Sequence, residues 1–364
     1  MPADIGRIKL YMGPHNVGPP GHQAPDDLEE TIVSFIAASR NTLDIAVQEL
    51  ESRPITDAIC AARRRKVYVR LVLESDYLME DKALADPFPV AGEKKANRRM
   101  HGALLKSNVQ VRSDLNPAIF HQKFCIRDLK DKNNAAVLTG STNFTPTGTG
   151  GNLNHIVVLE GRPAAKAYQE EFDEIWTGTF GTKRERHDGP PRKVRQSGVA
   201  TWVLFAPDHA PEMEIMKQML KAKTRIDFAM FTFAQSSGID DTMIVLQKSG
   251  ISVRGILDRR QGSQKWAATN GLLDNNVDLR MLKSGTGARK VHHKLMVIDK
   301  QVIIAGSFNY SGPANRLNDE NIIVIGDLDE TRSASRAKQE TLAKYALDEI
   351  DRMIEYQSVK VRRT

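Results

Sequence analysis

The chain has 364 residues, 40% of them hydrophobic, which is enough for two domains that each bury a sizeable core. Lys and Arg number 52 against 45 Asp and Glu, so the formal net charge is +7 and polyanions are favoured as partners. No apolar run approaches the ~18 residues of a membrane span, and the N-terminus lacks a signal-peptide pattern. The two cysteines, Cys60 and Cys125, form no disulfide framework. Together these features predict a cytoplasmic protein without integral membrane association.

Periodic apolar residues predict alternating helices and strands along the first half. We expect, in chain order, a helix over 27–40, a strand over 42–50, a helix over 55–65, a strand over 67–73 and a further helix before a strand over 120–126. A helical tail that includes 172–175 closes this half. Residues 183–198 are rich in Arg, Lys, Pro and Gly, which is typical of a linker.

The second half repeats this order, with a helix over 211–223, strands over 225–230, 251–254 and 291–298, and a helical tail that includes 347–350. The repeat predicts an α/β domain over 1–182, a basic linker over 183–198 and a second α/β domain over 199–364. Strands that alternate with helices favour a sandwich in which helices flank a mixed sheet, and we expect the two sandwiches to pack face to face.

A motif of His, Lys and Asp occurs twice, about 170 residues apart, and each copy is followed by Gly-Ser-x-Asn. The residues of the first copy are His121, Lys123, Asp128, Ser141 and Asn143, and those of the second are His292, Lys294, Asp299, Ser307 and Asn309. A single match of this kind is weak, but five residue types that recur in the same order at the same spacing are not expected by chance. The duplication predicts one active site built from two halves.

Strand parity separates the roles of the motif residues. His and Lys of each copy are two positions apart, so they lie on one face of the predicted strand and can meet one substrate, whereas Asp128 and Asp299 have the opposite parity and are predicted to be structural. Cys125 shares the His parity, although a buried apolar role is favoured for it. His292 and His293 point to opposite faces and no zinc-like ligand spacing lies nearby, so we predict catalysis without a metal or cofactor.

This pattern resembles the phospholipase D superfamily, whose signature is H-x-K-x4-D followed by G-S-x-N in two copies per active site. The resemblance covers most of the chain and implies two tandem phospholipase D-like α/β sandwich domains related by a pseudo-dyad, so that a monomer suffices for the active site. It implies that one His forms a phosphohistidine while the other protonates the leaving oxygen. The two Lys and two Asn would hold the phosphate, whose transition-state charge needs cationic and amide donors.

Members of that superfamily orient each His with a carboxylate or amide beyond the second block, and the matching positions here are Asn154 and Glu320. We predict that Glu320 partners His292, raises its pKa and makes it the general acid, which leaves His121 as the nucleophile. The opposite assignment stays open, because a carboxylate can also activate a nucleophilic His.

Three hypotheses remain for the function. The excess of basic over acidic residues favours a metal-independent nuclease that cleaves DNA or RNA. The candidate nucleic-acid-binding residues are Arg98, Arg99, Arg259, Arg260 and Lys265. The alternative is a phospholipase D or phosphatidyltransferase with cardiolipin-synthase-like chemistry. That enzyme would need an apolar entrance, yet aromatic residues make up only 6% of the chain and the nearest candidate loop is 87–90. A non-catalytic nucleic-acid-binding protein is disfavoured, because both motif copies keep their full residue set.

Overall fold

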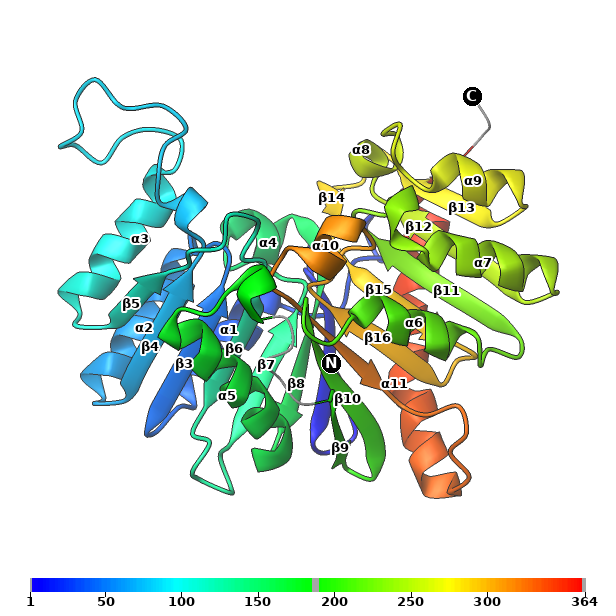
Figure 1. Cartoon of the computed structure of the whole chain (residues 1–364), viewed down its shortest axis with the longest axis horizontal. Helices are drawn as coiled ribbons and strands as arrows, with labels where there is room; N and C mark the ends of the chain where they lie inside the picture. The colour runs from blue at the N-terminus through cyan, green and yellow to red at the C-terminus, as the bar shows by residue number, and fades with distance from the viewer. Residues whose placement is uncertain (1, 185–189, 362–364) are drawn as a thin grey trace.

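The computed structural model describes residues 2–184 and 190–361, and these residues form two nine-stranded mixed sheets with helices packed on their faces (Figure 1). The predicted pair of α/β sandwiches is therefore confirmed. The path of the first sheet, in spatial order, is β1 (Ala3–Asp4), β2 (Ile8–Gly13), β8 (Asn152–Glu160), β7 (Ala136–Gly140), β6 (Lys123–Arg127), β3 (Thr42–Val47), β4 (Tyr68–Leu73) and β5 (Gln110–Ser113). A ninth strand from the second half, β14 (Lys290–Val291), pairs with β8.

The second sheet repeats this topology. Its spatial order is β9 (Arg192–Gln196), β10 (Val199–Ala206), β17 (Glu320–Ile325), β16 (Val302–Gly306), β15 (Lys294–Ile298), β11 (Arg225–Met230), β12 (Ser252–Leu257), β13 (Asp278–Leu282) and β18 (Ser358–Lys360). Read in this direction, β9 to β13 correspond one by one to β1 to β5 of the first sheet. Within each sheet β3 and β4, like β11 and β12, are parallel, and the motif strands β6 and β15 run antiparallel to β3 and β11.

The helices form two outer layers and one inner layer. Outer helices of the first half are α1 (Leu28–Ala37), α2 (Arg53–Arg64) and α3 (Lys95–Lys106), and those of the second half are α6 (Pro211–Met219), α7 (Ile239–Lys248) and α9 (Thr269–Asp274). The inner helices α5 (Arg162–Thr177) and α11 (Ser333–Gln357) contact strands of both sheets. Their apolar faces, with Tyr168, Phe172, Leu342 and Ile350, join one central core drawn from both halves. The halves therefore share a core, and their burial is coupled.

Short elements complete the described chain: η1 (Ser75–Tyr77), α4 (Pro146–Gly150), η2 (Gly181–Arg184), η3 (Gln235–Ser237), α8 (Arg259–Gly262) and α10 (Gly312–Arg316). In Figure 1, α4, α10 and β14 lie together where the two sheets meet. None of the helices within the described ranges is long and apolar enough to cross a membrane.

The predicted linker contains a strand. Residues 192–196 of the basic segment 183–198 form β9, which pairs with β10 at the edge of the second sheet. Arg192, Lys193 and Arg195 of β9 are exposed while the backbone pairs, so a basic composition did not prevent a strand. Residues 185–189 lie outside the described residues, and the domain boundaries at 182 and 199 stay a prediction.

Candidate active site

Each motif histidine precedes its strand rather than lying within it. The strands predicted over 120–126 and 291–298 begin only at Lys123 and Lys294. The backbone just before them leaves its own sheet and pairs with the other half, because His121 N–H donates to the carbonyl of Asp319 and His292 N–H to that of Leu153. The two halves thus exchange backbone hydrogen bonds at the pseudo-dyad, and this exchange brings each histidine to residues of the opposite domain.

His121 is oriented by Glu320. Its Nδ1 lies 2.7 Å from Oε2 of Glu320, at the start of β17 in the second half. The same carboxylate accepts hydrogen bonds from the Ser307 hydroxyl at 2.5 Å and from the amide of Asn318 at 3.4 Å. A carboxylate that faces only donors in this way fixes the proton of the imidazole on Nδ1 and leaves Nε2 with a lone pair.

His292 has a neutral partner instead. Its Nδ1 lies 2.9 Å from Oδ1 of Asn154 and 3.1 Å from the carbonyl of Ser141, both in the first half. The Ser141 hydroxyl donates to the same Asn154 oxygen at 2.8 Å, as Ser307 does to Glu320. The prediction that Glu320 partners His292 is therefore wrong, because the backbone exchange at the pseudo-dyad pairs each orienting residue with the histidine of the other half.

Burial is the largest influence on the protonation of His121, His292 and Glu320. It raises the pKa of Glu320 to about 8 and lowers the pKa of His121, whose imidazolium form the charges of Lys123 and Lys294 disfavour further. In the form that leaves Nε2 of His121 with a lone pair, the single proton between Nδ1 and Oε2 gives the pair one negative charge, which the charges of Lys123 and Lys294 offset. Burial and the same two lysines also lower the pKa of His292, so both rings are neutral before substrate binds.

The two lysines lie beneath the histidines and are 1% and 2% exposed. The Lys123 ammonium donates to Oε1 of Gln48 and to the His121 carbonyl, and the Lys294 ammonium to the His292 carbonyl. Lys294 Nζ also lies 3.2 Å from Nε2 of His292. Burial lowers the pKa of Lys123 to about 8 and that of Lys294 well below its usual value. Two desolvated cations so close together form a site that favours an anion.

The two asparagines of the second blocks are not equivalent. The Asn143 amide donates to Oε1 of Glu49 at 2.6 Å, and its own oxygen is buried and has no hydrogen-bond partner within the described part of the chain. The Asn309 oxygen accepts a long hydrogen bond from the N–H of Thr232, the position that matches Glu49 in the second half. Glu49 was missed by sequence reasoning, although its place just after β3 could have been found, since the carboxyl ends of parallel strands often carry functional side chains.

One cavity of about 310 Å3 unites the two halves. Both motif histidines and both asparagines line it, together with Glu49, Tyr77, Phe231 and Lys290. It continues into a cavity of about 430 Å3 in the first half, the acidic arm, whose carboxylates are Glu74, Asp76, Glu80 and Asp81. On the other side it continues into a cavity of about 510 Å3, the basic arm, whose cations are Arg259, Arg260, Lys283, Arg289 and Lys290.

The motif aspartates do not line this cavity, and each instead accepts backbone hydrogen bonds from the segment that leads into β3 or β11. The Asp128 carboxylate accepts from the backbone N–H groups of Arg40, Asn41 and Thr42, and Asp299 accepts in the same way from residues 223–225. Both have a positive φ of 50°. Cys125 is fully buried in the outer core of the first half. These placements match the structural roles predicted from strand parity.

A buried polar chain supports the site in each half. In one, Asn321 donates to Gln122, which donates to Glu171 on α5. In the other, His155 and His293 stack with their Nδ1 atoms 3.1 Å apart, and Nε2 of His293 lies 3.7 Å from Glu349 on α11. The chains occupy matching positions, so His293 serves the packing of the two halves. No group of three or more potential metal ligands occurs among the described residues.

The five predicted nucleic-acid-binding residues are dispersed. Arg98 on α3 is paired with Glu80 and donates to the Leu78 carbonyl, so it anchors the loop at 78–94. Arg99 is exposed on α3. Arg259 and Arg260 line the basic arm, and Lys265 is exposed beyond α8. Their contact with nucleic acid stays a prediction.

The sequence profile of a family described as "Cardiolipin synthase, PLD-like domain" matches residues 32–176 and 215–342. The mitochondrial cardiolipin hydrolase of Homo sapiens is 28% identical over 166 residues, which cover 46% of this chain and 57% of the relative. A phospholipase D of Rickettsia prowazekii is 31% identical over 140 residues, which cover 37% of this chain and 63% of the relative. The chain thus spans less than two thirds of either relative.

Among solved structures, the phosphatidylserine synthase of Haemophilus influenzae Rd KW20 aligns with a TM-score of 0.66 over 99% of this chain and 89% of that protein. The two sequences are 11% identical. At this identity the likeness concerns the fold.

Proposed function

Because this chain belongs to the phospholipase D superfamily, we propose that it is a phosphodiesterase that cleaves phospholipids through a covalent phosphohistidine. One observation carries the proposal: the two motif histidines line a single cavity, and each has its Nδ1 held by a partner from the other half. In each ring Nε2 is therefore the nitrogen available for chemistry. Two such nitrogens in one cavity are what a two-step displacement at phosphorus requires.

We assign His121 as the nucleophile. Attack by its Nε2 lone pair on phosphorus forms a P–N bond and places positive charge on the ring, which the Glu320 carboxylate stabilises through Nδ1–H. The P–O bond to the leaving alcohol breaks, and that oxygen takes a proton from Nε2 of His292. Water then attacks phosphorus, returns its proton to His292 and breaks the P–N bond.

His292 must gain a proton before it can act as the acid. Burial and the charges of Lys294 and Lys123 lower its pKa, and a bound phosphate anion would offset both charges and raise that pKa. Lys294, whose ammonium lies 3.2 Å from Nε2 of His292, is placed to share the proton. Binding of the substrate and activation of the acid are thereby coupled.

The charge around the cavity supports a phospholipid over a nucleic acid. A polynucleotide that crosses the site would need cations on both sides, yet the acidic arm is lined by four carboxyl groups and a single cation, Lys94, and only Glu80 of the four forms an ion pair, with Arg98, among the described residues. The net charge of +7 favoured a nuclease only because the sequence does not say where the charges lie. The comparisons likewise give the nuclease hypothesis no support.

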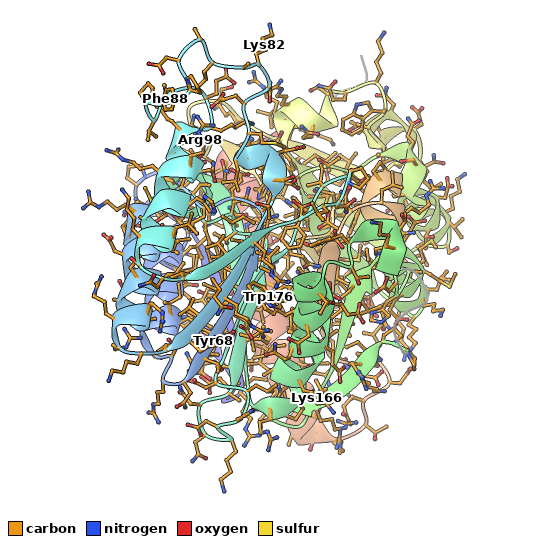
Figure 2. All side chains as sticks on the ribbon, turned by 60° about the vertical axis from the view of Figure 1, so that its left-hand side comes forward. Tyr68, Lys82, Phe88, Arg98, Lys166 and Trp176 are labelled. Atoms are coloured by element: carbon orange, nitrogen blue, oxygen red, sulfur yellow. The ribbon has the colours of Figure 1, made fainter. Side chains whose placement is uncertain are left out.

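An apolar contact for a lipid surface is present on the loop at 78–94. Phe88 is 93% exposed, and Met79 and Val90 on the same loop are also exposed. Figure 2 shows Phe88 and Lys82 on this loop, above α3. In Figure 1 the loop and α8 project on the same side of the molecule. The total aromatic content is low, but these exposed apolar side chains gather on one loop, and Met79 of that loop also lines the acidic arm.

The test is incubation of the purified protein in EDTA with phosphatidylcholine, phosphatidylglycerol and diphosphatidylglycerol vesicles, and separately with labelled single-stranded and double-stranded DNA and RNA. We expect lipid cleavage that His121→Ala and His292→Ala both abolish, with a phosphohistidine trapped by acid-free quenching and mass spectrometry. Cleavage of nucleic acid with intact lipids would establish the nuclease instead. Loss of activity in EDTA would overturn the metal-independent mechanism.

A further inference from the structure

A second cavity, the distal cavity, lies at the end of the first sheet opposite the catalytic cavity. It measures about 260 Å3, and the residues that line it include Arg7, Arg127, Lys132 and Gly161. Strand β6 runs from Lys123 at the catalytic site to Arg127 at the distal cavity. In Figure 1 the start of α5 and the turn between β6 and β7 lie at the end of the sheets away from α4, α10 and β14. The distal cavity is therefore separate from the catalytic machinery.

The charges of the distal cavity belong to the first half alone. The turn that carries Lys132 is longer there, because residues 129–135 join Asp128 to β7, whereas residues 300–301 join Asp299 to β16. The charged residues on the surrounding strands have uncharged counterparts in the second half, where Ala200, Ile298 and Gly326 stand in the places of Arg7, Arg127 and Glu160. The duplicated fold thus forms without these charges.

Cations are in excess around the distal cavity. Arg7 and Lys132 are exposed, and neither forms an ion pair among the described residues. The one carboxylate that lines the cavity, Glu160, accepts a hydrogen bond from the ammonium of Lys9 at 2.9 Å, which offsets its charge. Like charges that face one cavity repel one another, and a bound anion would relieve that repulsion.

Arg127 joins the distal cavity to a neighbouring groove of about 290 Å3, because it lines both. Burial lowers its pKa, and the carboxylates of Glu160 and Asp128 oppose this shift without forming an ion pair with it. Its guanidinium instead lies over the ring of Phe35 and donates to backbone carbonyls. The groove adds the hydroxyl groups of Thr31, Ser34 and Tyr11. An anion in the distal cavity could therefore carry a polar organic group into the groove.

Two groups without partners meet the distal cavity at Gly161. This glycine is the N-cap of the sixteen-residue helix α5, which has neither a capping side chain nor an acidic residue in its first turn, so its positive end is not neutralised. Gln196 of β9, from the second half, is fully buried, and both polar atoms of its amide lack a hydrogen-bond partner within the described residues. A Cβ atom on Gly161 would lie 3.8 Å from Oε1 of Gln196 and 3.6 Å from Nη1 of Arg7. An unsatisfied buried amide destabilises a fold, and a ligand that accepts its N–H would remove that cost.

We propose that the distal cavity binds the phosphate group of a small soluble phosphate ester. The phosphate charge complements Arg7 and Lys132, and its oxygens accept from the first turn of α5 and from the amide of Gln196. The organic part of the ester lies in the groove beyond Arg127. A soluble ester is favoured over a lipid headgroup, because the apolar loop at 78–94 projects away from the end of the sheets that holds this cavity (Figure 1). This inference does not depend on the proposed function.

The test titrates the full chain with glycerol 3-phosphate in a calorimeter, with acetate at equal ionic strength as the control anion. Hydrogen exchange followed by mass spectrometry locates the bound phosphate, since the catalytic cavity also favours anions. We expect slower exchange at 129–135 and 162–165, and at least about tenfold weaker binding to this site in Arg7→Gln/Lys132→Gln. The matched variant Lys95→Gln/Lys248→Gln removes two exposed charges from α3 and α7 and should bind as the wild type does. Protection confined to the catalytic segments, or an equal loss in both variants, would overturn the proposal.

A second variant tests the buried amide without removing a charge. We expect Gln196→Leu to raise Tm in the absence of ligand, because it removes an unsatisfied polar group, and to bind glycerol 3-phosphate more weakly than the wild type. An affinity equal to that of the wild type would show that Gln196 only fills space, and would overturn its part in the site. Vesicles that contain phosphatidate present the same phosphate group on a lipid. If they slow exchange at 162–165 as strongly as glycerol 3-phosphate does, the assignment of a soluble ligand is overturned.

Discussion

Replacement of Glu320 by Gln tests which histidine attacks phosphorus. The carboxylate of Glu320 faces three donors: Nδ1–H of His121, the Ser307 hydroxyl and the Asn318 amide. Glutamine keeps the shape but brings an NH2 group that must face one of them. If it faces Nδ1, the imidazole proton moves to Nε2, and the lone pair that attacks phosphorus is lost.

The size of the effect follows from this geometry. A hydrogen bond to a charged acceptor contributes about 1.5–3 kcal/mol against about 1 kcal/mol for a neutral one, so loss of the charge alone lowers kcat by roughly tenfold. A change of tautomer lowers it by up to ~10⁴-fold, the loss known for the equivalent carboxylate-to-amide change in a serine protease triad. We expect Glu320→Gln to fall between these limits.

The assay uses two substrates with the same phosphatidyl group, phosphatidylcholine and phosphatidyl-p-nitrophenol. Because p-nitrophenolate leaves without a proton, a defect in the acid affects only the first substrate in the step that forms the covalent intermediate. We expect Glu320→Gln to slow the burst with both substrates and Asn154→Ala, which disturbs His292, to slow it mainly with phosphatidylcholine. The reverse pattern would refute the assignment of His121 as the nucleophile.

Three further predictions concern stability and lipid contact. Asp128→Ala leaves three backbone N–H groups without their acceptor, so we expect the free energy of unfolding to fall by about 2 kcal/mol while activity per folded molecule is kept, measured by urea titration and initial rates. Burial and the nearby Asp114 raise the pKa of Glu74 from 4.5 to about 8, so the stability that the protonated Glu74 contributes is full below pH 4.5 and is lost as pH rises through about 8. Glu74→Gln should therefore flatten the fall of the free energy of unfolding with pH, measured by calorimetry. An unchanged pH slope in this variant would contradict the prediction. Phe88→Ser should weaken binding to phospholipid vesicles about tenfold in a sedimentation assay and leave the cleavage rate of a soluble phosphodiester unaltered, whereas equal vesicle binding would exclude the loop as an anchor.

The element order was predictable because it depends on local patterns. The strands at 42–47 and 225–230 and the helices before and after them follow from apolar periodicity, and the structure has them within a few residues. The strand β9 was missed because its charged composition resembles a linker, and only pairing with β10 makes it a strand. Edge strands of this kind depend on a partner that the local sequence does not specify.

The two motif copies, their equivalence and the matching positions of Asn154 and Glu320 could all be read from spacing, since a duplicated chain keeps its residue order. The sequence could not tell which histidine Asn154 and Glu320 each face, because that depends on how the two halves exchange backbone hydrogen bonds at the pseudo-dyad. The same holds for the charge of the site. A net charge of +7 is a property of composition, whereas the separation of carboxylates into one arm and cations into the other exists only once strand ends from distant parts of the chain meet around one cavity.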